Sequence, residues 1–167
     1  MTVHTSSHSG SQSGTVALRP ARPADLPAIE RLLTAASLPL AGVAECLGDF
    51  TVAEVGGTLV GVAGLEVRGD SALLRSVAVS PDWRDRGVGR ELVQRVLAGA
   101  EARGLNALYL LTTTADRYFP SFGFVRTTRD AVPTEIRDTA EFRGVCPDSA
   151  VVMSCALGGV GRASGTR

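Results

Sequence analysis

A glycine-rich stretch flanked by arginines offers the clearest chemistry in this sequence. The segment Ala72–Arg90 reads ALLRSVAVSPDWRDRGVGR, an apolar run followed by a proline turn and then Arg-x-x-Gly-x-Gly. The first amides of a helix lack partners within the helix, and glycine lets an anion approach the backbone closely. Gly87 and Gly89 occupy such a position, among arginines that add positive charge. The pattern predicts a pyrophosphate site, although a Gly-x-Gly pair alone also fits close packing against a strand.

Two regular elements must hold this stretch in place. The apolar residues of 72–80 point to both faces of a strand, which is typical of a strand buried between two layers. From Gly87 to Gly104, apolar residues recur at the spacing of a helix. A further apolar run, Ala107–Thr113, predicts the next strand, and a strand, a helix and a strand in this order require the two strands to be parallel neighbours.

The length of 167 residues indicates one domain. Residues 1–14 are expected to form a disordered tail, since they are polar and rich in Gly and Ser, and a domain at 15–157 is followed by a C-terminal tail at 158–167. A net charge of zero argues against nucleic acid or an anionic membrane as a partner. Without a secretory signal or a membrane-spanning run, a cytoplasmic location is expected.

The cysteines and histidines restrict the chemistry further. Cys46, Cys146 and Cys155 are an odd number without metal-ligand spacing, which favours reduced thiols and no metal site. His4 and His8 fall in the N-terminal tail. We therefore expect neither a histidine-based triad nor a histidine-rich metal site in the folded domain.

The other elements follow from turn residues and periodicity. A first strand at 16–19 precedes a helix that Asp25 can cap. Gly56-Gly57 suits a tight hairpin between strands at 50–55 and 58–67, which lead into the central strand as an antiparallel meander. A short second helix near Cys46–Phe50, a helix at 115–122, a strand from Gly123 to about Thr128 and a closing strand at 149–157 complete the prediction.

Two motifs resemble a known superfamily. Val-x-Pro-x-x-Arg-x-x-Gly-x-Gly, from Val79 to Gly89, resembles the acyl-coenzyme A motif of the GNAT superfamily of N-acetyltransferases. ADRYFPSFGF, with an aromatic pair before Gly-Phe, resembles a later motif of that superfamily. The resemblance implies a single α/β (α+β) domain whose mixed sheet of about seven strands carries flanking helices and splays at its central parallel pair. It also implies a homodimer, because closing strands of this fold often pair subunits.

The resemblance also implies acetyl-CoA as co-substrate. The amides of Arg84–Arg90 would bind the pyrophosphate, and the backbone edge of Val77–Val79 would pair with pantetheine. An amide near Val77 or Ala78 would stabilise the oxyanion while an amine attacks the thioester directly. The implied cofactor-binding residues are Val77, Ala78, Val79, Arg84, Asp85, Arg86, Gly87, Val88, Gly89, Arg90 and Phe119.

The proton-transfer groups are less clearly marked. Many members of the superfamily place a tyrosine where this chain has Phe119, and tyrosine here occupies the preceding position, Tyr118. Because adjacent helical residues point about 100° apart, the two positions are not equivalent. Tyr118 is the candidate proton donor, with packing, substrate contact or protonation by water as alternatives. Glu66 is the candidate general base, and a solvated strand residue is the alternative.

Arg75 interrupts the apolar central strand, where an unpaired guanidinium would cost several kcal/mol. We expect it to face the cleft and bind an oxyanion of a small acidic amine, or else to form an internal salt bridge with Glu66 or Glu45. The predicted substrate-binding residues are Arg75, Ser76, Glu45, Thr112 and Thr113.

Three segments narrow the resemblance further: LLRSVAV, YLLTTTADRYFPSFGF and TAEFRGVCPDSAVVM. They are similar to the arsenic-resistance N-acetyltransferases, which implies a small-molecule acceptor, acetylation of the α-amino group of arsinothricin or phosphinothricin, and detoxification. Two alternatives stay open. One is N-acetylation of glutamate, and the other is a non-catalytic acyl-CoA sensor.

Overall fold

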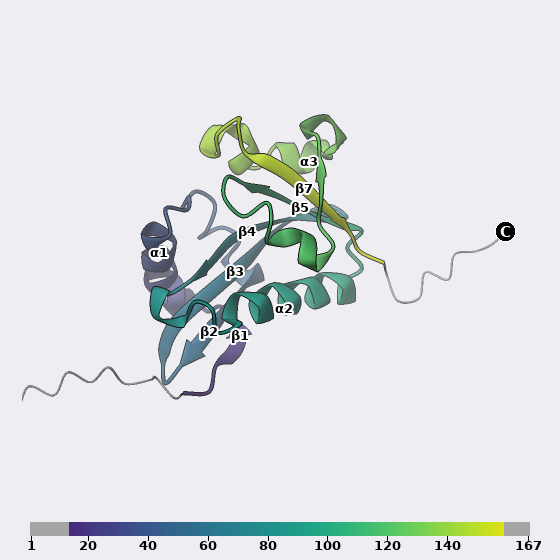
Figure 1. Ribbon diagram of the computed structural model, residues 1–167. Coiled ribbons are helices and arrows are strands. Elements are labelled where there is room, and N and C mark those ends of the chain that lie inside the picture. Colours follow the sequence, from purple (N-terminus) through teal and green to yellow (C-terminus); the bar gives the residue numbers. More distant parts are fainter. Residues whose placement is uncertain (1–13, 159–167) are drawn as a thin grey trace, which may run out of the picture.

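The computed structural model describes residues 14–158, and the two predicted tails, apart from Gly14 and Gly158, lie outside this range. Seven strands form one sheet in the order β1-β2-β3-β4-β5-β7-β6 (Figure 1). Among the strands of residues 14–158, only β4 and β5 pair in parallel, which confirms the predicted mixed sheet. The strands are β1 (Ala17–Pro20), β2 (Phe50–Val55), β3 (Thr58–Arg68), β4 (Ser71–Val79), β5 (Ala107–Thr112), β6 (Val125–Thr127) and β7 (Val151–Ala156).

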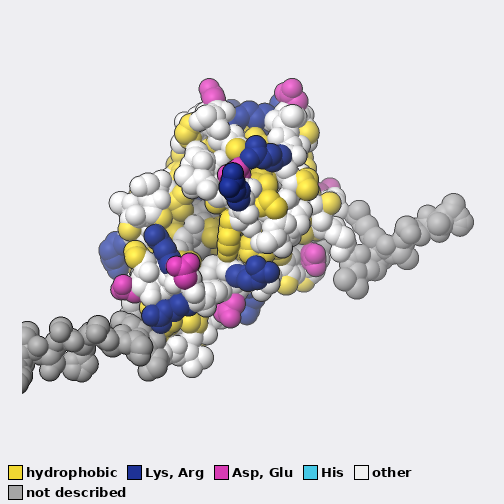
Figure 2. Space-filling model, in the orientation of Figure 1, with side chains coloured by type: hydrophobic (Ala, Val, Ile, Leu, Met, Phe, Trp, Pro, Cys, Tyr) yellow, Lys and Arg dark blue, Asp and Glu magenta, His cyan; other side chains and the backbone are white. Residues whose placement is uncertain are grey.

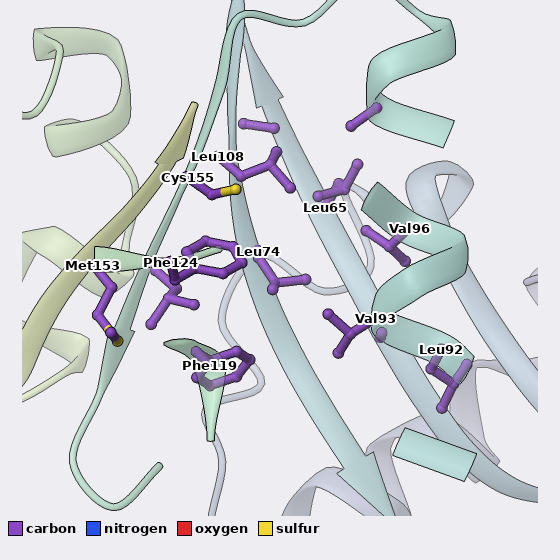
Figure 3. Packing of buried hydrophobic residues seen from close by; sticks show 14 of the residues in the cluster. Leu65, Leu74, Leu92, Val93, Val96, Leu108, Phe119, Phe124, Met153 and Cys155 are labelled. Carbon is purple, nitrogen blue, oxygen red and sulfur yellow. The ribbon is translucent and has the colours of Figure 1, made fainter. Parts of the chain in front are cut away.

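Helices cover both faces of the sheet. The helices are α1 (Leu26–Ala35), α2 (Val88–Ala102) and the short α3 (Thr134–Arg137). Neighbouring residues of a strand point to opposite faces, so Val52 packs with α1 and Ala53 with the α2 side. In the same way Leu73 packs near α3, whereas Leu74 packs on the α2 side. Figure 3 shows side chains of α2 facing Leu74 and its neighbours in the core.

The parallel pair of strands separates after three residue pairs. Ser71 pairs with Ala107, Ala72 with Leu108 and Leu73 with Tyr109, and no pairing continues beyond them. From Leu74 onward, β4 therefore runs without a neighbouring strand on that side. The predicted splay of the central parallel pair is confirmed.

A β-bulge bends β4 beside this opening. Gly64 of β3 pairs with Arg75, and Val62 pairs with Ala78, so β4 contains one more residue than β3 over this stretch. Ser76 has a φ of 60°, in the left-handed region that non-glycine residues rarely adopt. Such bulges redirect a strand and the groups on it, often next to active sites.

Two predicted helices are shorter than expected. The predicted helix at 115–122 is a single 3₁₀ turn at Phe119–Phe122, and the segment near Cys46 forms a 3₁₀ turn at Leu47–Asp49. Pro120 lies in the turn Phe119–Phe122. Because it has no backbone N–H, it cannot donate the hydrogen bond that would extend this turn into a longer helix toward its N-terminal side.

The cysteines agree with the expectation of free thiols. Cys46, Cys146 and Cys155 are all unpaired. Cys155 is buried in the core on the α2 side, and Cys46 packs beside the core under α1. Within residues 14–158, no helix has the length and apolar character needed to cross a membrane.

Candidate active site

A cavity of about 590 Å³ opens where β4 and β5 separate. Residues 74–79 of β4 and 110–112 of β5 form its central wall. Gly89 and Tyr118 line it on the α2 side, and residues 36–39, which follow α1, line it on the other. The cavity therefore crosses the sheet from one face to the other. Figure 2 shows a hollow lined with hydrophobic side chains near the middle of this face.

The N-terminus of α2 borders the cavity. Gly87 is the N-cap residue. Because glycine has no side chain, no side chain caps this end of the helix. The first amides of α2 therefore have no competing side-chain acceptor at the cap, and they carry the positive end of the helix dipole. An anionic group fits this position.

The two glycines of the motif have different physical roles. Gly87 has a φ of 81°, in the region that favours glycine, and a Cβ there would meet no atom within 4 Å. A Cβ at Gly89 would lie 3.3 Å from Tyr118 Oη and 3.4 Å from Val79 Cγ2. Gly87 is required by the shape of the turn, whereas Gly89 keeps the wall of the cavity open.

Arginines surround this helix start. Arg84 lines the cavity, and its Nε donates a hydrogen bond of 3.2 Å to the carbonyl of Val79. The guanidinium of Arg86 lies 4.7 Å from the Trp83 ring centre, and that of Arg90 lies 5.4 Å from the Phe122 ring centre. The predicted loop residues Asp85, Arg86, Gly87, Val88 and Arg90 lie beside the cavity rather than in its wall.

Tyr118 and Phe119 lie opposite the helix start. Both residues line the cavity, but Tyr118 is 39% exposed, whereas Phe119 is buried and contacts Phe124 edge-on. Figure 3 shows Phe119 near Phe124 in the core. Partial burial raises the pKa of the Tyr118 phenol, and the nearby Arg90 guanidinium lowers it by less. At neutral pH Tyr118 is a protonated group on the cavity wall.

Arg75 lies in the cavity wall on the α1 side, and its side chain is fully buried. Its Nη1 donates to Glu66 Oε1 at 2.9 Å, and its Nη2 donates to the carbonyl of Ala41 at 2.6 Å. Its Nε donates to Ser76 Oγ at 3.2 Å and lies 3.8 Å from Glu141 Oε1. Arg75 therefore forms the internal salt bridge given as one alternative, and it also borders the cavity.

The structure corrects the expectations for two acidic residues. Glu66 is 6% exposed, so the alternative of a solvated strand residue is wrong, because both its oxygens pair with guanidinium groups of Arg75 and Arg68. Glu66 does not line the cavity. Glu45 is exposed in a turn after α1 and is neither a partner of Arg75 nor part of the cavity wall.

The predicted residues Ser76, Val77, Ala78, Val79, Thr112 and Thr113 all line the cavity. The hydroxyl of Thr112 accepts a hydrogen bond of 2.9 Å from the amide of Ala115, which shapes the turn after β5. Among residues 14–158, no group of three or more His, Cys, Asp or Glu side chains could hold a metal ion.

Glu141 lines the cavity but is not among the predicted site residues. It is 5% exposed, in the turn Glu141–Val145 between α3 and β7. Burial raises its pKa to about 7, which the Arg75 guanidinium opposes and the Glu66 carboxylate assists. In the sequence, the role of Glu141 is indicated only by its place in the segment TAEFRGVCPDSAVVM, where it lies in a polar stretch.

Glu141 is expected to make the protein less stable as the pH rises from 4.5 to about 7. A carboxyl group whose pKa is raised by folding binds its proton more tightly in the folded state, so this stabilisation is complete below the unfolded pKa and disappears through the folded pKa. The expected loss is about 3 kcal/mol. Urea unfolding across this range should show the decline in the wild type and a flatter curve in Glu141→Gln.

An equally steep decline in Glu141→Gln would contradict this assignment. Asp25 does not interfere, because its ordinary pKa of 3.8 and its folded pKa of about 2, lowered by hydrogen bonds from Arg19, both lie below the range measured.

The sheet order, the splayed parallel pair and the uncapped helix beside it agree with the fold that the sequence motifs imply. Residues 47–126 match the family model described as an acetyltransferase (GNAT) domain. The chain therefore contains a GNAT domain, as the motif at Val79–Gly89 predicts.

Curated relatives of this chain are amino-acid acetyltransferases. The one from Azotobacter vinelandii is 39% identical over 80 residues, which cover 47% of this chain and 18% of the relative. The one from Ralstonia nicotianae is 36% identical over 96 residues, which cover 54% of this chain and 21% of the relative. The match thus spans about a fifth of the length of these relatives.

Solved structures extend the similarity to most of the chain. N-acetylglutamate synthase from Neisseria gonorrhoeae, complexed with coenzyme A and N-acetyl-glutamate, has a TM-score of 0.75 and 25% identity, covering 86% of this chain and 35% of that one. Rv2747 from Mycobacterium tuberculosis, in complex with CoA and NLQ, has a TM-score of 0.73 and 27% identity. The match covers 84% of this chain and 99% of Rv2747. Both of these neighbours were solved in complex with coenzyme A.

Proposed function

We propose that this chain is an N-acetyltransferase that moves the acetyl group of acetyl-CoA to the α-amino group of a small acidic amino acid, with glutamate as the first candidate. The observation that carries this proposal is the cavity that crosses the sheet. It joins an uncapped helix start on the α2 side to the buried charges of Arg75 and Glu141 on the α1 side.

The α2 side suits the coenzyme. The amides at the start of α2 and the positive charges of Arg84, Arg86 and Arg90 would hold the pyrophosphate, and acetyl-CoA would supply an activated acetyl group. The unpaired edge of β4 at Val77–Val79 offers backbone groups to pantetheine. The bulge at Ser76 lies directly before Val77, whose amide is the candidate oxyanion donor.

The α1 side suits an amino acid. Arg75 and Arg84 are the cationic side chains among the described residues that line the cavity, and Arg75 lies on the α1 side. An acidic acceptor can place a carboxylate against Arg75 and the hydroxyls of Thr112 and Thr113, with its amine toward the thioester. The amino-acid acetyltransferases and the N-acetylglutamate synthase among the relatives favour this acceptor class.

The test is a panel of amines incubated with acetyl-CoA, with thiol release as the signal and mass spectrometry of the acetylated product. We expect release with glutamate or a close analogue and much less with alanine, leucine or a peptide N-terminus. Coenzyme A binding without thiol release from any amine would instead favour an acyl-CoA sensor.

Arsinothricin and phosphinothricin form the second acceptor class, which the three sequence segments similar to arsenic-resistance N-acetyltransferases favour. They carry the same α-amino acid group as glutamate, so the same cavity would hold them. Release with these analogues at rates above glutamate would support detoxification. Release with glutamate alone would exclude it.

Tyr118→Phe is expected to lower kcat about 100-fold and leave the affinity for acetyl-CoA nearly unchanged, because the phenol would protonate the leaving thiolate. Steady-state kinetics and calorimetry measure the two quantities. Tyr109→Phe is the matched control, since Tyr109 packs with the core near α3 and does not line the cavity. A kcat within twofold of wild type would show that water protonates the thiolate.

A further inference from the structure

Glu141 is a buried carboxylate beside the point where the amine would react. Its Oε1 lies 3.8 Å from Arg75 Nε, and this Nε donates to Ser76 Oγ, one residue before Val77. Glu141, Ser76 and Val77 all line the same cavity. The carboxylate therefore sits next to the bulge that precedes the candidate oxyanion donor, on the side of the cavity where the acceptor would bind.

The two acidic residues of this cluster are held in different ways. Glu66 forms close ion pairs with two guanidinium groups, at 2.9 Å from Arg75 and 2.6 Å from Arg68, and it does not line the cavity. The contact of Glu141 with Arg75 is too long for a hydrogen bond, and Glu141 does line the cavity. Glu66 is committed to fixing Arg75, whereas Glu141 can accept a proton from a molecule in the cavity.

We propose that Glu141 is the general base that takes the proton from the acceptor ammonium group. The inference rests on the proposed function, and it replaces Glu66 in that role. Burial raises the pKa of Glu141 to about 7, which places its proton affinity in the range that a general base needs near neutral pH.

The step balances as follows. The ammonium group gives one proton to the Glu141 carboxylate, and the neutral amine forms a C–N bond to the thioester carbonyl carbon. The C–S bond breaks, the Tyr118 phenol gives its proton to the departing thiolate, and the second proton of the nitrogen restores the phenol. Glu141 then releases its proton to water, so that an ammonium group and acetyl-CoA yield an amide, coenzyme A and one proton.

The charged groups around Glu141 come from three elements. Arg75 on β4 and Glu66 on β3 face it, and the titratable thiol of Cys146, which directly follows the turn Glu141–Val145, also lines the cavity. Burial raises the pKa of the Cys146 thiol to about 11, so this thiol stays neutral in the working range. The charged residues of α3, Glu135 and Arg137, are exposed on the helix surface.

The experiment compares kcat between about pH 5.5 and 9 for three proteins, wild type, Glu141→Gln and Glu66→Gln, with the best acceptor of the amine panel. Wild type should lose kcat on the acidic side with an apparent pKa near 7. Glu141→Gln should lose this acidic limb and about 100-fold in kcat, with an unchanged dissociation constant for acetyl-CoA. Glu66→Gln, which removes a carboxylate that does not line the cavity, should keep the limb and move it to lower pH, because the Glu66 carboxylate helps raise the pKa of Glu141.

A second acceptor with a different amine pKa separates the base from the substrate. The limb should stay in place if Glu141 titrates, and a limb that moves with the amine pKa would overturn the proposal. Carbon NMR of glutamate-labelled protein without substrate should show one carboxyl titrating near pH 7, absent from Glu141→Gln. Glu141→Asp provides a further variant, which should retain the acidic limb at a lower kcat.

The outcomes separate the two proposals. Thiol release by wild type with an acidic limb that persists in Glu141→Gln would overturn the role of Glu141 and leave the proposed function standing. The absence of thiol release from wild type with every amine would overturn both.

Discussion

Gly89→Glu is expected to weaken acetyl-CoA binding at least about 100-fold, measured by calorimetry. A Cβ at Gly89 would already lie 3.3 Å from Tyr118 Oη and 3.4 Å from Val79 Cγ2, so the longer glutamate side chain would occupy the cavity. It also adds a negative charge in the first turn of α2, where it would repel a bound pyrophosphate.

Gly99→Glu is the matched control, because it makes the same change on the same helix. A Cβ at Gly99 would meet no atom within 4 Å, and the residue is exposed. Its affinity for acetyl-CoA should equal that of wild type. If Gly89→Glu also bound with wild-type affinity, the coenzyme would have to bind elsewhere.

Arg75→Ala is expected to lower the free energy of unfolding by about 3–5 kcal/mol near neutral pH. The Arg75 side chain is fully buried, and its removal leaves the buried Glu66 without its cavity-side partner and Glu141 without a neighbouring cation. The carbonyl of Ala41 also loses its hydrogen bond, which loosens the turn after α1. Urea unfolding monitored by circular dichroism measures the change.

Arg68→Ala tests whether the burial of Arg75 causes the expected loss of stability. Arg68 pairs with the same carboxylate, Glu66, but its side chain is 43% exposed. Exposed ion pairs contribute little to stability, so Arg68→Ala should lower the free energy of unfolding by no more than about 1 kcal/mol. Equal losses in Arg68→Ala and Arg75→Ala would contradict the assignment of a special, buried role to Arg75.

Kinetics of Arg75→Ala separate a binding role from a structural one. Arg75 lines the cavity on the α1 side, away from the start of α2, so the KM of the acceptor should rise much more than the KM of acetyl-CoA. Equal rises in both constants would indicate that Arg75 acts through folding alone.

The coenzyme half of the site is predictable from sequence because its parts are adjacent in the chain. A buried strand, a proline turn and Gly87 at the helix start occupy one short segment, and each has a local physical signature. The meander of β2, β3 and β4 is equally local, since the Gly56-Gly57 turn joins neighbouring strands. The parallel pairing of β5 with β4 then follows from the intervening helix.

The acceptor half depends on contacts between distant segments. Glu141 meets Arg75 across 66 positions of sequence, by way of a turn whose residues carry no regular periodicity. The choice of Glu66 rather than Glu45 as partner of Arg75 depends on the register of β3 against β4, which pairs Glu66 with Leu73. The bulge at Ser76 has no local signature, because serine gains its left-handed conformation from the pairing on both sides of it.

The early separation of β4 and β5 leaves a stretch of each strand without a partner strand on the side of the cavity. Such edges can recruit a strand from another chain, and elsewhere proteins protect them with charge or coverage. In this protein, bound coenzyme would cover the unpaired edge of β4. When it dissociates, the exposed edge could pair with a strand of another copy of the chain. Saturating coenzyme A should therefore delay heat-induced turbidity as well as raise the melting temperature, and storage without it favours aggregates.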